Sequence, residues 1–162
     1  MTAIRLRPAT PADLAAINAV IERAVMTWQL PERVKRLALP TYRYHLHDLE
    51  HLTIVVAEHS ELSVIGVAAW EPANARDLPA GQTGLLLHGL YVDPDRQRAG
   101  AGSQLLDAAL AAAREQGFDG LLVKARPEAE GFFLARGLRP LPVTDAERDY
   151  PHRFWKDTAG NG

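Results

Sequence analysis

The chain has 162 residues, of which 47% are hydrophobic, and its formal net charge is -2 at neutral pH. This length suits one domain, and this composition supports a buried core, so a disordered chain is excluded. The small negative charge argues against duplex nucleic acid or an anionic membrane as a partner. The sequence contains no cysteine, which excludes disulfides, thiolate metal sites and a cysteine nucleophile.

The sequence also carries no signal for export or membrane insertion. The N-terminal residues lack the long apolar core of a signal peptide. No apolar run approaches the roughly 18 residues that a membrane helix needs. We therefore expect a soluble, cytoplasmic protein with a single domain over residues 1–157 and a disordered tail at 158–162.

The first predicted element is a strand over residues 4–7, where apolar and basic residues alternate. Residues 10–13 supply a cap, a first-position proline and an acid, so a helix is expected over 11–26. Pro31 is expected to open a second helix with Val34 and Leu37 on its apolar face. Pro40 is expected to interrupt that helix, and residues 42–50 are ambiguous.

Apolar runs at 52–57 and 62–70 predict two buried strands that form a hairpin. Residues 71–83 form a long loop, and long loops are usually functional or mobile. Residues 85–92 predict a third strand, which precedes an amphipathic helix that ends at Gly117.

The remaining expected elements are a strand at 121–123, a short helix at 128–136 and strands near 138–143 and 151–156. The order of strands (β) and helices (α) is β-α-α-β-β-β-α-β-α-β-β. Early hairpins followed by a helical crossover predict an α/β (α+β) fold with a mixed, mostly antiparallel central sheet of about 6–7 strands and helices on both faces.

The turn Gln97-Arg98-Ala99-Gly100-Ala101-Gly102 joins the third strand to the amphipathic helix. Glycines allow close backbone approach, and the N–H groups of a first helical turn attract an anion such as a pyrophosphate. A P-loop is excluded because Ser103 and Gln104 follow Gly102, and Leu105 stands where a Rossmann fingerprint needs its third glycine. Glycine spacing by itself leaves a plain strand-to-helix turn as an equal alternative.

The surroundings of this turn resemble the acetyl-CoA motif of the GCN5-related N-acetyltransferases (GNAT). Residues 90–106 are similar to the family's V-x-P strand end, Q/R-x-x-G-x-G/A turn and helix, with Gln97, Gly100 and Gly102 at the pattern positions. Residues 129–138 are similar to the family's A-x-x-F-Y-x-x-x-G-F segment. The resemblance covers about residues 4–156 and implies a GNAT-like fold.

The resemblance also implies acetyl-CoA as acyl donor. The amides of the turn would contact the pyrophosphate, and the pantetheine arm would pair with the end of the third strand, where Gly89 is expected to allow a bulge. The implied cofactor-binding residues are Leu90, Tyr91, Val92, Gln97, Arg98, Ala99, Gly100, Ala101, Gly102, Ser103, Phe132 and Phe133. No metal is proposed, because His45 and His47 have no third ligand of obvious spacing.

Acetyl transfer to an amine needs a base, an oxyanion donor and a proton for the thiolate. His88 is the candidate base, with an ordinary sheet histidine as the alternative, and the backbone of Leu90 is the family-implied oxyanion donor. The family usually has tyrosine where this chain has Phe133, which cannot donate a proton. Tyr91 or Tyr150 is then the candidate acid, unless the thiolate leaves through water or both tyrosines only pack.

The predicted function is an acetyl-CoA-dependent N-acyltransferase that moves an acetyl group to a primary amine by direct attack in a ternary complex. The alternative is a non-catalytic acyl-CoA-binding sensor or regulatory module. The expected partner is a small-molecule or peptide amine, without nucleic acid or membrane, and homodimerisation is left open. An acceptor pocket, or ordinary packing, is expected at Met26, Trp28, Gln29, Tyr42, Tyr44, His45 and His47.

Overall fold

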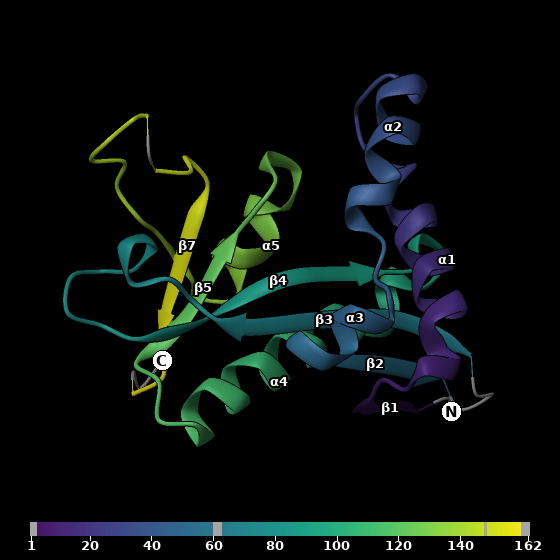
Figure 1. Cartoon of the computed structure of the whole chain (residues 1–162), viewed down its shortest axis with the longest axis horizontal. Coiled ribbons are helices and arrows are strands. Elements are labelled where there is room, and N and C mark those ends of the chain that lie inside the picture. Colours follow the sequence, from purple (N-terminus) through teal and green to yellow (C-terminus); the bar gives the residue numbers. More distant parts are fainter. Residues whose placement is uncertain (1–2, 60–62, 148, 160–162) are drawn as a thin grey trace. The chain divides into compact units, whose positions relative to one another are not determined.

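The computed structural model describes residues 3–59, 63–147 and 149–159. Seven strands form one sheet in the order β1-β2-β3-β4-β5-β7-β6 (Figure 1). The mixed, mostly antiparallel sheet confirms the predicted fold class, and the order of elements matches the prediction except for one added helix at Leu46–His51, in the segment left ambiguous. The chain divides into two compact units, Met1–Ala69 with Gly89–Asp107 (unit 1) and Trp70–His88 with Ala108–Gly162 (unit 2).

The helices and strands have the following bounds. The helices are α1 (Leu14–Val25), α2 (Glu32–Tyr42), α3 (Leu46–His51), α4 (Ala101–Glu115) and α5 (Glu130–Ala135). The strands are β1 (Ile4–Pro8), β2 (Thr53–His59), β3 (Val64–Pro72), β4 (Gly84–Val92), β5 (Gly120–Lys124), β6 (Arg139–Pro140) and β7 (Arg153–Asp157). Short 3-10 turns lie at η1 (Pro11–Asp13), η2 (Ala75–Asp77), η3 (Pro94–Ala99) and η4 (Pro127–Ala129).

In unit 1, side chains along β2 and β3 alternate between the two faces of the sheet, and each face is covered by a different helix. Val56 and Val67 are fully buried and pack in one cluster with Ile17 of α1. Gly66, the neighbour of Val67, faces α4, because a Cβ on Gly66 would lie 3.1 Å from Leu105 Cδ1. Since side chains alternate across a strand, these contacts place helices on both faces of this part of the sheet.

The predicted start of the first helix is confirmed by its hydrogen bonds. The backbone N–H of Thr10 donates to Asp13 Oδ2 over 2.7 Å. Arg7 donates to both carboxylate oxygens of Asp13 over 2.8 Å each and to Glu58 over 3.1 Å. The hydrogen bonds from Arg7 outweigh burial and, with those from Thr10, hold the pKa of Asp13 well below its usual range. An ion-pair network therefore joins β1, β2 and the entry to α1.

The second helix differs from its prediction in two respects. α2 continues through Pro40 to Tyr42, because a proline this close to a helix end removes only one hydrogen bond near the last turn. Val34 and Leu37 are 45% and 72% exposed, whereas Leu39 is 3% exposed. The expected apolar face of α2 is therefore wrong, since the helix meets the core through Leu39 and Tyr42 near its end.

In unit 2, a buried indole fixes the pairing of three strands. β4 and β5 pair in parallel from Gly84 with Gly120 to Leu87 with Val123, and β5 pairs antiparallel with β7. Trp155 of β7 is fully buried. A Cβ on Gly84 would lie 2.9 Å from its ring, and one on Gly120 would overlap the ring. Glycine is required at both positions because the indole occupies the space of a side chain.

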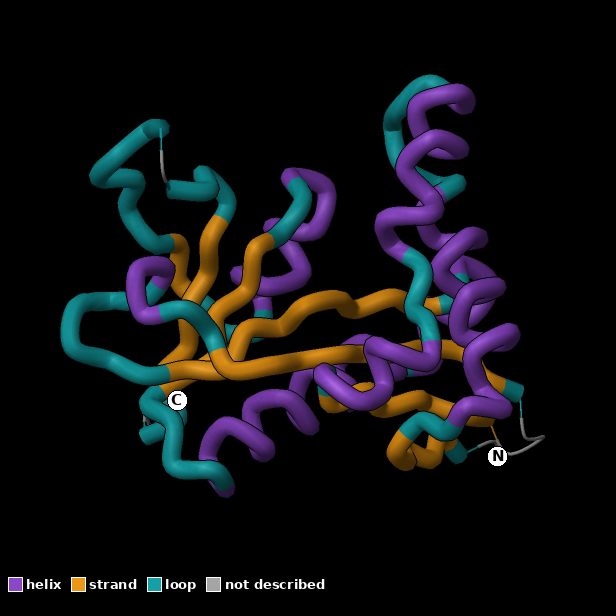
Figure 2. Tube along the Cα trace, in the orientation of Figure 1, coloured by secondary structure: helices purple, strands orange, loops and turns teal. Residues whose placement is uncertain are grey.

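The connection between β3 and β4 is drawn mostly as loop and contains one helical turn, η2 (Figure 2). Arg153 holds this connection in unit 2, because its guanidinium donates to the carbonyls of Asp77 and Pro142 over 2.8 and 2.9 Å. At the C-terminus, Thr158 Oγ1 donates to the carbonyl of Phe118 over 2.7 Å. The rest of the expected tail, residues 160–162, lies outside the described residues.

Candidate functional site

The end of β4 carries the first group of candidate residues. Leu90, Tyr91 and Val92 are half-buried, and Tyr91 packs against the core cluster of unit 1. Gly89 is not among the glycines with positive φ in the described residues. A Cβ on Gly89 would lie 2.5 Å from Tyr44 Oη and 2.8 Å from Tyr91 Cε2. Gly89 is therefore required for space rather than for a left-handed backbone.

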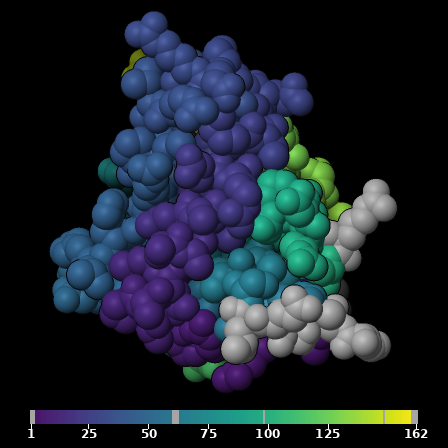
Figure 3. All heavy atoms as spheres, turned by 90° about the vertical axis from the view of Figure 1, so that its right-hand side faces the viewer, coloured from purple at the N-terminus to yellow at the C-terminus, as the bar shows by residue number. Residues whose placement is uncertain are grey.

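Asp93 anchors the segment that follows β4. Its N–H donates to the carbonyl of Ile65 over 2.8 Å, and its carboxylate accepts from Arg23 of α1 over 2.7 Å and from Asp95 N over 3.0 Å. Burial opposes ionisation, but these hydrogen bonds prevail and the pKa of Asp93 lies below its usual value. Figure 3 shows the green segment around η3 at the surface beside the purple α1.

The glycine turn combines a 3-10 turn with a left-handed residue. η3 ends at Ala99, and Gly100 adopts φ 88° and ψ 8°. Nothing lies within 4 Å of a Cβ built on Gly100, so the space beside this residue is open. The N–H of Gln104 donates to Gly100 O over 3.1 Å. The N–H groups of Ala101 and Gly102 belong to the first turn of α4, before the residue that donates this bond, so they have no acceptor inside the helix.

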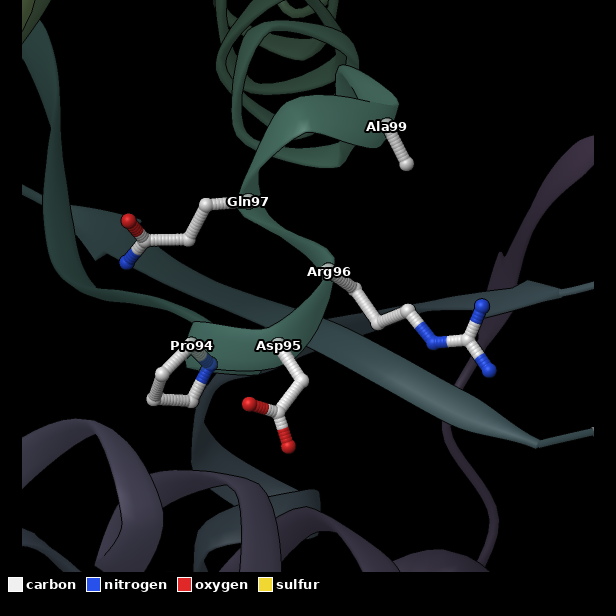
Figure 4. A pocket seen from close by; sticks show the side chains of 5 residues that line it. All are labelled: Pro94, Asp95, Arg96, Gln97 and Ala99. Atoms are coloured by element: carbon white, nitrogen blue, oxygen red, sulfur yellow. The ribbon is translucent and has the colours of Figure 1, made fainter.

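A hollow of about 420 Å³ opens beside η3. It is lined by Pro94, Asp95, Arg96, Gln97 and Ala99, and the side chains of Gln97 and Arg96 leave the turn in opposite directions (Figure 4). The lining holds one carboxylate and one guanidinium, so its side chains supply little net charge. The partial positive charge at this turn is that of the N-terminus of the 15-residue α4, and the open space at Gly100 leaves room beside it.

Phe132 and Phe133 lie on α5 in unit 2. Phe133 is 5% exposed, and its ring stacks on Phe154 of β7 with 6.3 Å between centroids. The ring of Phe132 meets Phe133 edge-on at 5.2 Å and lies 3.9 Å below the guanidinium of Arg136. Phe133 is thus a core residue of this unit.

The candidate proton-transfer residues of unit 2 differ in their surroundings. His88 is exposed and is the last residue of β4 that belongs to unit 2. Tyr150 is 37% exposed, and its hydroxyl donates to the carbonyl of Ala125 over 3.0 Å. Sequence reasoning missed a third group, His152, whose Nδ1 lies 2.8 Å from Glu130 Oε2. The two residues are 22 positions apart, and no spacing rule joins them.

The aromatic residues expected to line an acceptor pocket pack within unit 1. Trp28 and Tyr42 meet edge-on, with 5.2 Å between their ring centroids, and both pack against the core cluster. Tyr44 is 3% exposed. The amide of Asn18 accepts from Tyr44 N and donates to Tyr44 O, both over 2.9 Å. Ordinary packing accounts for these three side chains.

The spacing of His45 and His47 predicts no metal site, whereas the structure groups His47 with two other residues. His47, Glu50 and His51 are exposed on α3, and their candidate ligand atoms all lie within 4.8 Å of one another. The rings of His47 and His51 are 4.1 Å apart. A helix brings positions i, i+3 and i+4 to one face, so these three side chains can together hold a metal ion.

Comparison with known proteins identifies the family. Residues 19–138 match the model of the acetyltransferase (GNAT) family. The PaiA N-acetyltransferase of Thermoplasma acidophilum, solved with coenzyme A, is 14% identical at a TM-score of 0.74, with 96% of this chain and 99% of that chain covered. A GNAT acetyltransferase of Brucella melitensis, solved with acetyl-CoA, is 21% identical at a TM-score of 0.65, with 99% and 91% covered.

AtaT, solved in complex with acetyl-methionyl-tRNAfMet, is 18% identical at a TM-score of 0.62, with 96% of this chain and 95% of that chain covered. These structures show that the fold is shared. No curated protein matches the sequence significantly. Among the described residues, no helix has the length and apolar character needed to cross a bilayer. The match over residues 19–138 shows that the chain belongs to the GNAT family and is an acetyltransferase.

Proposed function

We propose that this acetyltransferase moves an acetyl group from acetyl-CoA to a primary amine by direct attack in a ternary complex. The observation that carries the proposal is the turn at Gly100, where a left-handed residue with open space precedes the N–H groups of α4. A diphosphate is the part of the donor that such a turn binds. The structures with coenzyme A and acetyl-CoA among the similar folds support this proposal.

The proposed donor contacts follow the chain. The backbone of residues 97–103 binds the pyrophosphate, and Leu90, Tyr91 and Val92 pair with the pantetheine arm. The half-buried ring of Phe132 is a proposed apolar contact of the donor, and buried Phe133 supports it from the core.

The composition supports direct attack. Without cysteine, no cysteinyl acyl-enzyme can form. We assign His88, which is exposed, as the base that keeps the acceptor amine neutral. The N–H of Leu90 is the proposed donor to the oxyanion. Tyr150 is a weak candidate acid, because its hydroxyl proton is engaged by the carbonyl of Ala125.

The proposed acceptor is the primary amine of a small molecule or peptide. Because AtaT binds acetyl-methionyl-tRNAfMet, the acceptor panel includes methionyl-tRNA beside amino acids, polyamines, aminoglycosides and peptides. Each candidate offers an amine that must lose a proton before it attacks.

The experiment measures thiol release from acetyl-CoA with each acceptor and the affinity for CoA by calorimetry. The proposal requires CoA binding together with release above the hydrolysis background for at least one amine. Tight CoA binding without turnover across the panel would instead identify a sensor or regulatory module. The absence of CoA binding would refute the assignment of the turn.

A further inference from the structure

His152 and Glu130 form a histidine–carboxylate pair at one end of unit 2. His152 Nδ1 lies 2.8 Å from Glu130 Oε2, and the two side chains are 32% and 35% exposed. A carboxylate at this distance fixes the proton on Nδ1 in the neutral imidazole and stabilises the charge of the imidazolium. Partial exposure leaves the ring accessible to a substrate. This geometry is that of a proton-transfer group.

The neighbouring polar groups are already engaged with one another. Lys124 Nζ lies 3.3 Å from Asp77, and Arg126 donates to Glu128 over 2.8 Å. The Tyr150 hydroxyl donates to a carbonyl, and the Tyr150 ring meets that of His152 edge-on at 5.9 Å. His152 Nε2, by contrast, makes no hydrogen bond within the described part of the chain.

The strand register places this pair at the carboxyl end of β5. Lys124, the last residue of β5, pairs with Arg153, and the next N–H, that of Ala125, donates to the carbonyl of His152 over 2.9 Å. On the other side of β5, Val123 pairs with Leu87, the residue before His88. His88, in the middle of β4, therefore lies level with the carboxyl end of β5, next to which His152 is bonded.

We propose that His152, oriented by Glu130, is the acid that protonates the departing thiolate in the acyl transfer described above. The acceptor nitrogen attacks the thioester carbon, so that an N–C bond forms and the C–S bond breaks with its electron pair on sulfur. The imidazolium gives its Nε2 proton to that sulfur and becomes neutral, still bonded to Glu130. The amine gives its proton to the base, and His152 regains a proton from water.

The charged surroundings of His152 are consistent with this role. Glu130 of α5 is the carboxylate in direct contact with the ring, and the Tyr150 hydroxyl is held by a carbonyl. Arg126 and Glu128, which follow Ala125 closely in the chain, form an ion pair with each other, and Arg153, the residue after His152, pairs with Asp149.

The activity test compares His152→Ala, Glu130→Gln and the control Glu128→Gln, which removes a neighbouring paired carboxylate. Loss of an acid is expected to lower kcat about 10²- to 10⁴-fold in His152→Ala, with KM for acetyl-CoA unchanged and the alkaline limb of the pH profile lost. Added imidazole should restore part of the rate. Glu130→Gln should show a smaller loss, and Glu128→Gln none. An unchanged kcat and pH profile in His152→Ala overturn the proposal, as does equal loss in Glu128→Gln.

The pairing itself is tested without turnover. ¹⁵N NMR of the His152 ring should show the Nδ1–H tautomer in the wild type and a mixture of tautomers in Glu130→Ala. The same tautomer in both proteins would refute orientation by Glu130. This role depends on the proposed acetyl transfer. If no amine is acetylated by the wild type, the proposed function fails together with the acid role, whereas a failure confined to the His152 variants leaves the proposed function intact.

Discussion

Replacing Gly100 tests the proposed pyrophosphate turn, and Gly117 provides a matched control. Both glycines have left-handed backbones, with φ of 88° and 80°, and nothing lies within 4 Å of a Cβ built on either residue. A residue other than glycine in this conformation costs about 1–2 kcal/mol. Because a Cβ meets no neighbour at either site, Gly100→Trp and Gly117→Trp should lose similar stability.

The expected loss is measurable by thermal unfolding. For a chain of this size, about 1 kcal/mol lowers Tm by about 2–4 °C, so each variant should unfold roughly 2–8 °C below the wild type. The two variants should differ in ligand binding, because only the Gly100 side chain enters the open space before α4. Losing hydrogen bonds to a charged group costs about 1.5–3 kcal/mol each, which is about 10- to 150-fold in Kd.

Calorimetric titration with CoA is the assay. Gly100→Trp should bind at least about tenfold more weakly than Gly117→Trp, whose affinity should equal that of the wild type. If Gly100→Trp retains wild-type affinity while its Tm falls as expected, the turn does not hold the pyrophosphate. If both variants lose CoA affinity equally, the weaker binding results from their lower stability, and the assignment of the pyrophosphate to this turn also fails.

Three further predictions concern the base, acid stability and the indole. His88→Ala should lower kcat and remove the acidic limb of the pH profile without changing CoA affinity, and a wild-type profile would make His88 structural. Because the pKa of Asp13 is held low in the folded protein, its stabilising effect is complete above the unfolded value of about 3.9 and is lost as pH falls below that value. The free energy of unfolding, measured with urea at about pH 6 and about pH 3, should therefore fall less between these pH values in Asp13→Asn than in the wild type. An equal decrease in both proteins would contradict this prediction. Trp155→Ala should lower the free energy of unfolding by about 3–5 kcal/mol, and Gly120→Ala by about 1–3 kcal/mol. Urea unfolding measures both, and losses below about 0.5 kcal/mol would show that the indole contact is not tight.

Features that depend on residues close together in the chain could be predicted from the sequence. The cap and acid at 10–13 define the entry to α1, because their hydrogen bonds join residues three positions apart. The turn around Gly100 was also predictable, since its glycines, the strand before it and the helix after it are contiguous. Apolar runs and turn residues were enough for the order of elements and for the family resemblance.

Features that depend on residues far apart in the chain became visible only in the folded structure. The apolar residues of α2 could not be assigned to a face from periodicity, because their burial depends on which elements pack against them. The need for glycine at positions 84 and 120 could be recognised only from the position of Trp155. The need for glycine at position 89 could be recognised only from the position of Tyr44. The pairing of His152 with Glu130 was likewise invisible in the sequence, because strand pairing, rather than local spacing, brings the ends of β5, α5 and β7 together.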